Sequence, residues 1–106
     1  MNHAHHTIVD QIKTVIKQTD PSATAILYGS RATGKAKKSS DWDILILLDK
    51  TTVSVKDEQS FRHNLYDIEL ETGESISTLV YTKQDWNTRL SVTPIYQAIK
   101  LKGIVL

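Results

Sequence analysis

The chain has 106 residues, of which 40% are hydrophobic and 24% are charged, and its net charge is +1. This length fits one small domain with a single core, and the charge gives no general argument for binding nucleic acid. The lack of cysteine excludes disulfides and thiolate metal sites, and the longest apolar run, of five residues, is far too short to cross a membrane. Because the N-terminus also lacks the apolar segment of a signal peptide, we expect a cytoplasmic protein.

Hydrophobic spacing and turn residues divide the sequence into alternating helices and strands. In chain order we expect a helix over residues 7–18, a strand over 25–28, a short helix from 30, a strand over 42–48, a helix over 57–70, a strand over 75–82, a short helix over 83–90 and a last helix from 93 to 102. We expect residues 1–6 to be disordered and residues 104–106 to form a tail. This order predicts one domain of the α/β (α+β) class over residues 1–106, with helices packed against a small mixed sheet.

Two carboxylates one residue apart, Asp41 and Asp43, stand at the start of the second expected strand. Residues i and i+2 of a strand point to the same face, so these side chains project side by side. Two carboxylates held so close repel each other unless a cation or a proton lies between them. Proteins bind Mg²⁺ through one or two carboxylates together with the phosphates of a substrate. The pair therefore predicts a metal site that serves a nucleotide.

A Gly-Ser pair, Gly29 and Ser30, lies at the end of the preceding strand, ten residues before the acidic pair. Glycine lets the backbone approach a phosphate closely, and serine offers a hydroxyl and a backbone N–H to phosphate oxygens. Arg31 and the lysines of the following loop could add positive charge for a polyphosphate. A structural role for Arg31 and a merely solvated loop are the alternatives. We also assign Ser40, directly before Asp41, to the nucleotide-binding residues.

This pattern, Gly29-Ser30 followed after ten residues by Asp41-Trp42-Asp43, resembles the motif of the nucleotidyltransferase superfamily that includes DNA polymerase beta. More narrowly, the chain resembles the minimal nucleotidyltransferases of bacteria and archaea. The resemblance implies a polymerase beta-like fold and Mg²⁺-dependent transfer of a nucleoside monophosphate, AMP from ATP first of all, to a hydroxyl of a protein or small molecule. It also implies a HEPN-domain partner in a toxin–antitoxin pair. A homo-oligomer stays open, and we expect neither a nucleic-acid nor a membrane partner.

The third carboxylate of that family has no evident counterpart in this sequence. It usually lies on the next strand, whose first residues we expect beside Asp41 and Asp43 because a strand–helix–strand crossover makes the two strands parallel. Residues 75–79 contain no acid, and Glu74 is the nearest candidate. We therefore assign Glu74 as the third catalytic residue. If Glu74 does not serve, the alternative is a nucleotide-binding antitoxin or interaction module with weak or no catalysis that acts by contact.

Overall fold

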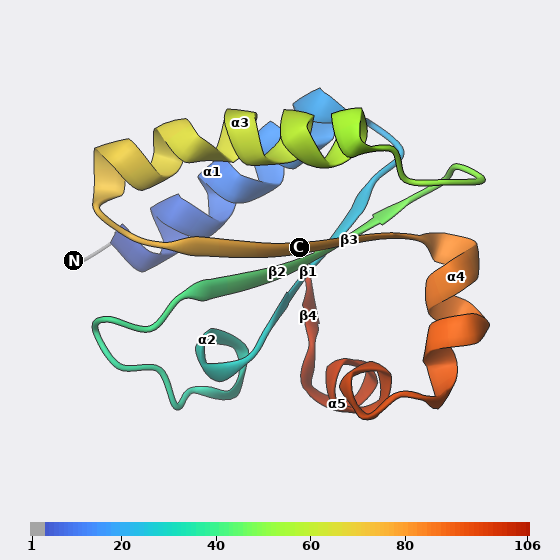
Figure 1. The fold of residues 1–106 in the computed structure, drawn as a ribbon. Helices are drawn as coiled ribbons and strands as arrows, with labels where there is room; N and C mark the ends of the chain where they lie inside the picture. Colours follow the sequence, from blue (N-terminus) through green and yellow to red (C-terminus); the bar gives the residue numbers. More distant parts are fainter. Residues whose placement is uncertain (1–3) are drawn as a thin grey trace.

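The computed structural model describes residues 4–106, with side chains from Ile8 onward, and it has two layers of helices around one sheet (Figure 1). Helices α1 and α3 lie together on one face, whereas α4 and α5 lie on the other side of the sheet (Figure 1). The elements are α1 (Ala4–Thr19), β1 (Thr24–Tyr28), α2 (Ser30–Thr33), β2 (Trp42–Leu48), α3 (Val55–Thr72), β3 (Ile76–Thr82), α4 (Lys83–Asn87), the 3-10 helix η1 (Arg89–Val92), α5 (Pro94–Lys102) and β4 (Ile104–Val105).

The sheet is mixed, and its strands lie in the order β3-β2-β1-β4. Strand β2 runs antiparallel to β1 and parallel to β3, to which it is joined through α3, and β1 also pairs antiparallel with β4. The expected mixed sheet is confirmed, and β2 lies in its interior. In this register Asp43 lies opposite Tyr28 on β1 and opposite Ser77 on β3. The start of β2 therefore has a neighbouring strand on each side.

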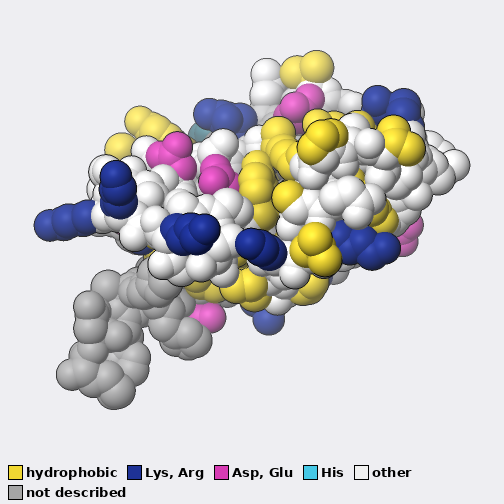
Figure 2. Space-filling model, turned by 90° about the horizontal axis from the view of Figure 1, so that it is seen from below, with side chains coloured by type: hydrophobic (Ala, Val, Ile, Leu, Met, Phe, Trp, Pro, Cys, Tyr) yellow, Lys and Arg dark blue, Asp and Glu magenta, His cyan; other side chains and the backbone are white. Residues whose placement is uncertain are grey.

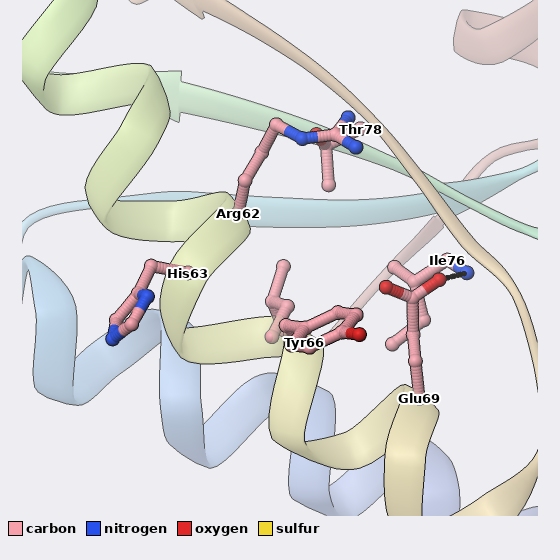
Figure 3. A pocket seen from close by; sticks show the side chains of 7 residues that line it. Arg62, His63, Tyr66, Glu69, Ile76 and Thr78 are labelled. Carbon is pink, nitrogen blue, oxygen red and sulfur yellow. Dashed lines mark hydrogen bonds between the residues drawn. The ribbon is translucent and has the colours of Figure 1, made fainter.

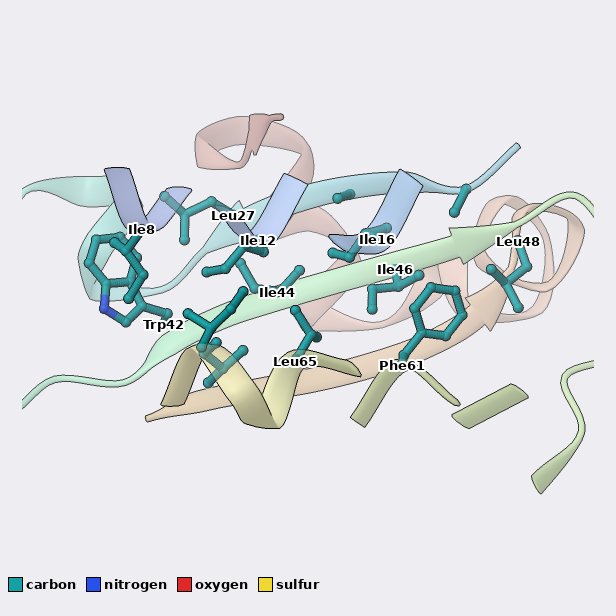
Figure 4. Packing of buried hydrophobic residues seen from close by; sticks show 14 residues of the cluster. Ile8, Ile12, Ile16, Leu27, Trp42, Ile44, Ile46, Leu48, Phe61 and Leu65 are labelled. Atoms are coloured by element: carbon teal, nitrogen blue, oxygen red, sulfur yellow. The ribbon is translucent and has the colours of Figure 1, made fainter. Parts of the chain in front are cut away.

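Strand β2 is buried on both faces, which explains its nearly continuous apolar sequence. On one face its side chains pack against α1 and α3, and on the other Leu45 and Leu47 contact Trp86 and Ile99. Figure 4 shows the first of these clusters, where the helix residues that contact the strand recur every four positions in α1. Its labelled members are Ile8, Ile12, Ile16, Leu27, Trp42, Ile44, Ile46, Leu48, Phe61 and Leu65.

Helix α3 begins at Val55, two residues before the expected start at Asp57. The hydroxyl of Ser54 accepts a hydrogen bond from the backbone N–H of Asp57 at 3.0 Å, and the Asp57 carboxylate accepts one from the N–H of Ser54 at 3.0 Å. This reciprocal pair satisfies two N–H groups that a helix start leaves open. The helix ends at Thr72, two residues beyond the expected end, and Gly73 caps it with a positive φ of 73° and an N–H that donates to the carbonyl of Glu69.

Three expectations at the ends of elements are wrong. Helix α1 begins at Ala4 rather than Thr7 and so includes residues 4–6, while residues 1–3 lie outside the described part. The segment expected as one helix over 83–90 is divided into α4 and η1. The expected tail instead contains β4, because β1 has a free edge that Ile104 and Val105 fill. None of the helices described between residues 4 and 106 is long and apolar enough to cross a membrane.

Candidate metal and nucleotide site

The turn after β1 depends on the backbone of Gly29, which has φ 73° and ψ −157°. Only glycine adopts this region without appreciable strain. The carbonyl of Gly29 accepts hydrogen bonds from Ala32 and Thr33 at 3.1 and 3.2 Å, which start the short helix α2. A side chain on Gly29 would also collide with the Asp43 carboxylate, since an added Cβ would lie 3.3 Å from its Cγ and closer still to Oδ2. The structure thus brings the predicted turn and the predicted acid into direct contact.

The two carboxylates of the acidic pair differ in their surroundings: Asp41 is exposed, and Asp43 is half-buried on β2. Burial raises the pKa of Asp43, and the negative charge of Asp41 raises it further. The pKa of Tyr28, opposite Asp43, is also raised, mainly by burial and then by the charge of Asp43. Each shift marks a place where added negative charge is unfavourable. A cation bound here would relieve that repulsion.

The pair fits a hard cation such as Mg²⁺. Its donor atoms are carboxylate oxygens, and Mg²⁺ commonly takes only one or two carboxylates and completes its shell with water and substrate phosphates. Among residues with described side chains, no group of three His, Cys, Asp or Glu residues is arranged to hold a metal. A metal at Asp41 and Asp43 would therefore keep several positions for water or phosphate.

Glu74, the expected third carboxylate, is not brought to the acidic pair. Its Oε1 accepts a hydrogen bond from Nε1 of Trp42 at 3.0 Å and one from Nη2 of Arg31 at 3.3 Å. Trp42 packs in the cluster under α1 and α3, whereas the alternation of β2 points Asp43 to the opposite face. The position of β3 that lies beside Asp43 is held by Ser77, which is exposed. Glu74 therefore contacts the neighbours of the acidic pair and not the pair itself.

The other three predicted nucleotide-binding residues lie around the same turn. Ser30 is the first residue of α2, and among the described residues no partner is found for its hydroxyl. Ser40 closes the following loop, because its Oγ accepts the N–H of Lys37 at 2.8 Å. Arg31 donates to the carbonyls of Lys38 and Ser40. Ser30 is thus free to meet a ligand, whereas Ser40 and Arg31 have partners within the protein.

The loop over residues 34–40 gives this end of the molecule positive charge. Lys35, Lys37 and Lys38 are all exposed. Figure 2 shows Lys and Arg side chains beside acidic ones at this end, and hydrophobic side chains gathered toward α5. Exposed lysines next to an acidic pair suit a ligand that carries both a metal and several phosphates.

A separate hollow of about 230 Å³ lies between α3 and β3. Figure 3 shows Arg62, Tyr66 and Thr78 around it, and Glu69 accepting a hydrogen bond from the N–H of Ile76, at 2.9 Å. This bond satisfies the N–H of Ile76, which points away from β2 at the outer side of β3, an edge strand of the sheet. The hollow contains neither carboxylate of the acidic pair, so it is not part of this site.

Sequence reasoning missed two features of the site. It did not identify Tyr28 as a neighbour of Asp43, because the long connection between β1 and β2 hides their register. It also missed the indole of Trp42 as a donor to Glu74, because that contact spans 32 residues of sequence. The polar atom of Trp42, next to two acids, is the one signal that could have indicated a polar partner.

Comparison with known proteins gives one family and several similar structures. The family model described as polymerase beta, nucleotidyltransferase, matches residues 10–100. No curated protein matches the sequence. A chain in the crystal structure of a toxin–antitoxin with AMP-PNP has 14% identity and a TM-score of 0.63, with 91% of this chain and 69% of that chain covered.

Two further structures have the same fold. One is a variant of the toxin–antitoxin MntA-HpeT with two Asp-to-Glu substitutions, at 14% identity and a TM-score of 0.64, covering 99% of this chain and 72% of that one. The other is the Cid1 poly(U) polymerase with MgGTP bound, at 19% identity and a TM-score of 0.57. Here the match covers 95% of this chain but only 38% of the polymerase.

Proposed function

Because the chain belongs to the polymerase beta nucleotidyltransferase family, we propose that it transfers a nucleoside monophosphate, AMP from ATP first of all, to a hydroxyl of a protein or small molecule. The observation that carries this proposal is the contact between the Gly29 turn and the Asp43 carboxylate. It supports a site where one ligand meets backbone N–H groups and two carboxylates together. Asp41 and Asp43 would hold Mg²⁺, and Gly29 and Ser30 would face the phosphates.

The proposed reaction is a single displacement at phosphorus. The acceptor oxygen forms a bond to the α-phosphorus while the bond from that phosphorus to the bridging oxygen breaks, and pyrophosphate leaves. The hydroxyl proton passes to a carboxylate or to water. Bound Mg²⁺ would offset negative charge on the transferring group. The chain itself supplies the two carboxylates that hold the metal and a turn without a side chain, where the phosphates have room to approach.

We further propose a toxin protein as the partner and acceptor, which fits a HEPN-domain protein. The support is that two similar structures are toxin–antitoxin structures and one of them contains AMP-PNP. A second candidate function is neutralisation of that toxin by contact alone. Its support is that the described side chains contain no third metal ligand and that Ser77 stands beside Asp43.

A labelling experiment separates the two functions. The chain is incubated with Mg²⁺, the protein encoded beside it and ATP labelled either at the α- or at the γ-phosphate. Nucleotidyl transfer places the α-label, and not the γ-label, on a hydroxyl side chain of the partner, because pyrophosphate carries the γ-phosphate away. If the two proteins form a complex and neither label is transferred, contact alone is the function.

Replacing Ser77 with aspartate is expected to tighten metal binding roughly tenfold, or about 1.4 kcal/mol. The parallel register places residue 77 beside Asp43, so the new carboxylate would be a third ligand. Calorimetric titration with Mn²⁺ and a non-hydrolysable ATP analogue measures the change. Gln84→Asp, which adds the same charge on exposed α4, is the matched control. Equal affinities of the two variants would show that position 77 does not face the metal.

A further inference from the structure

Arg31 is held by several partners, although the short helix α2 in which it lies has no buried residue. Its Nη2 donates to the carbonyl of Ser40 at 3.0 Å, to the carbonyl of Lys38 at 3.3 Å and to Oε1 of Glu74 at 3.3 Å. Its guanidinium carbon lies 4.5 Å from the centre of the Trp42 ring. These contacts join α2, the following loop, the first residue of β2 and Glu74, two residues before β3.

The position of the guanidinium argues for a structural task. Only 11% of the Arg31 side chain is exposed, and its Nε is buried without a hydrogen-bond partner among the described residues. Burying an arginine in this way is unfavourable unless its charge and donors are used. Arg31 uses its charge on Glu74 and on the face of Trp42, and its donors on two backbone carbonyls. Little of its surface is left for a phosphate.

Arg31 contacts the residues on each side of Asp41 in the chain. Ser40 precedes Asp41 and Trp42 follows it, and both contact the guanidinium. Glu74 accepts a hydrogen bond from the same guanidinium and another from the indole N–H of Trp42 at 3.0 Å. Asp41 itself is exposed, so its place depends on its two neighbours in the chain.

We propose that Arg31 is a positioning residue that fixes the segment Ser40–Trp42, and with it the carboxylate of Asp41. It acts together with Glu74 and the ring of Trp42. Its effect on metal binding rests on the function proposed above, whereas its effect on the segment does not. Two residues that the sequence assigned to the nucleotide and to catalysis, Arg31 and Glu74, thus serve the acidic pair from outside it.

Amide hydrogen exchange of the free protein tests the first part. Arg31→Lys keeps the charge but loses the planar donor group that reaches three oxygens and lies on the indole. We expect exchange in residues 35–41 to rise roughly tenfold, with the rest of the fold unchanged. Arg62→Lys, on the exposed face of α3, is the matched control and leaves this exchange as it is. Unchanged exchange in Arg31→Lys overturns the proposal.

Glu74→Gln is the second variant, for the case that Arg31→Lys does not fold. It keeps an acceptor for Trp42 and removes only the charge that faces Arg31, so exchange in residues 35–41 should rise by a smaller factor, about threefold. If exchange in this segment equals that of the wild-type protein, Glu74 and Arg31 do not hold it, and the proposal is overturned.

Metal binding and kinetics test the second part. In Arg31→Lys we expect Mn²⁺ to bind roughly tenfold more weakly in the presence of a non-hydrolysable ATP analogue, and kcat to fall with KM for ATP nearly unchanged. A raised KM at constant kcat would mean that Arg31 contacts the phosphates directly, and it would overturn the positioning role. Faster amide exchange with an unchanged Mn²⁺ affinity would overturn that role as well. If the wild-type protein binds no Mn²⁺ with nucleotide while exchange rises in the variant, the proposed function fails and the hold on the segment stands.

Discussion

Replacing Asp43 with asparagine is expected to lower nucleotidyl transfer at least about a hundredfold, which corresponds to roughly 3 kcal/mol of transition-state stabilisation. The amide keeps the shape of the side chain but removes the charge that would hold Mg²⁺. Transfer of α-labelled AMP to the acceptor measures the loss. Asp49→Asn, the same change at an exposed acid just beyond the other end of β2, is the control and should retain the wild-type rate.

The same substitution is expected to stabilise the metal-free protein. Folding raises the pKa of Asp43 above its ordinary value of 3.8, so the folded state binds its proton more tightly than the unfolded state does. The stabilisation that this proton gives the fold is fully present below pH 3.8. It is lost as pH rises through the raised pKa of Asp43 in the folded state. At neutral pH the charged Asp43 therefore destabilises the fold, and asparagine removes this term.

Thermal unfolding with and without Mg²⁺ checks the prediction. A ligand at a hundred times its Kd stabilises a fold by about 2.7 kcal/mol, so Mg²⁺ with nucleotide should raise the Tm of the wild-type protein. In Asp43→Asn this increase should vanish, while the Tm without metal equals or exceeds that of the wild type. An increase of the same size in the variant would exclude Asp43 as a ligand.

Replacing Gly29 with alanine is expected to destabilise the fold by roughly 2–3 kcal/mol and to abolish metal binding. Two effects add: the backbone at φ 73° and ψ −157° is strained for any residue with a Cβ, and that Cβ would push against the Asp43 carboxylate. Urea unfolding measures the loss of stability. Mn²⁺ titration, at a temperature where the variant is folded, measures the loss of metal binding.

Gly73 provides a matched control for this experiment. It has the same φ of 73°, but a Cβ added there meets no atom within 4 Å. Gly73→Ala should therefore lose only about 1 kcal/mol, the usual difference between glycine and alanine in a left-handed conformation, and should bind Mn²⁺ normally. If Gly29→Ala resembles Gly73→Ala in both measurements, the contact between the turn and the acid has no role in the site.

The parts of the fold that sequence reasoning found are those with strong local signals. The apolar run predicted a strand over residues 42–48, where β2 lies, and the helix expected from 93 to 102 is α5. Strand β4 was missed because Ile104 and Val105 are too few to show a period, and their pairing depends on the free edge of β1. The start of α3 was predicted two residues too late because aspartate, rather than the usual glutamate, completes the capping box with Ser54.

The site also has features that follow from local spacing and features that do not. The nearness of Asp41 and Asp43 follows from their spacing at the start of β2. The nearness of Gly29 to Asp43 follows from antiparallel pairing, which places Tyr28 opposite Asp43. The partners of Glu74 do not follow from spacing, because its contacts with Arg31 and Trp42 depend on how three separate segments meet. Whether Asp41, Asp43, Gly29 and Ser30 bind the metal and nucleotide remains a prediction for the experiments above.

The connection between β1 and β2 leaves the sheet after Tyr28 and returns at Trp42, so that Asp43 lies directly opposite Tyr28. Its two ends are therefore fixed by sheet pairing, whereas its lysine-rich tip is exposed. Lengthening such a closed loop is cheap, since each doubling of its length costs only about 0.6 kcal/mol. The tip can thus change in length and charge through evolution without moving Gly29 and Asp43 at its base, the residues proposed here to meet phosphate and metal.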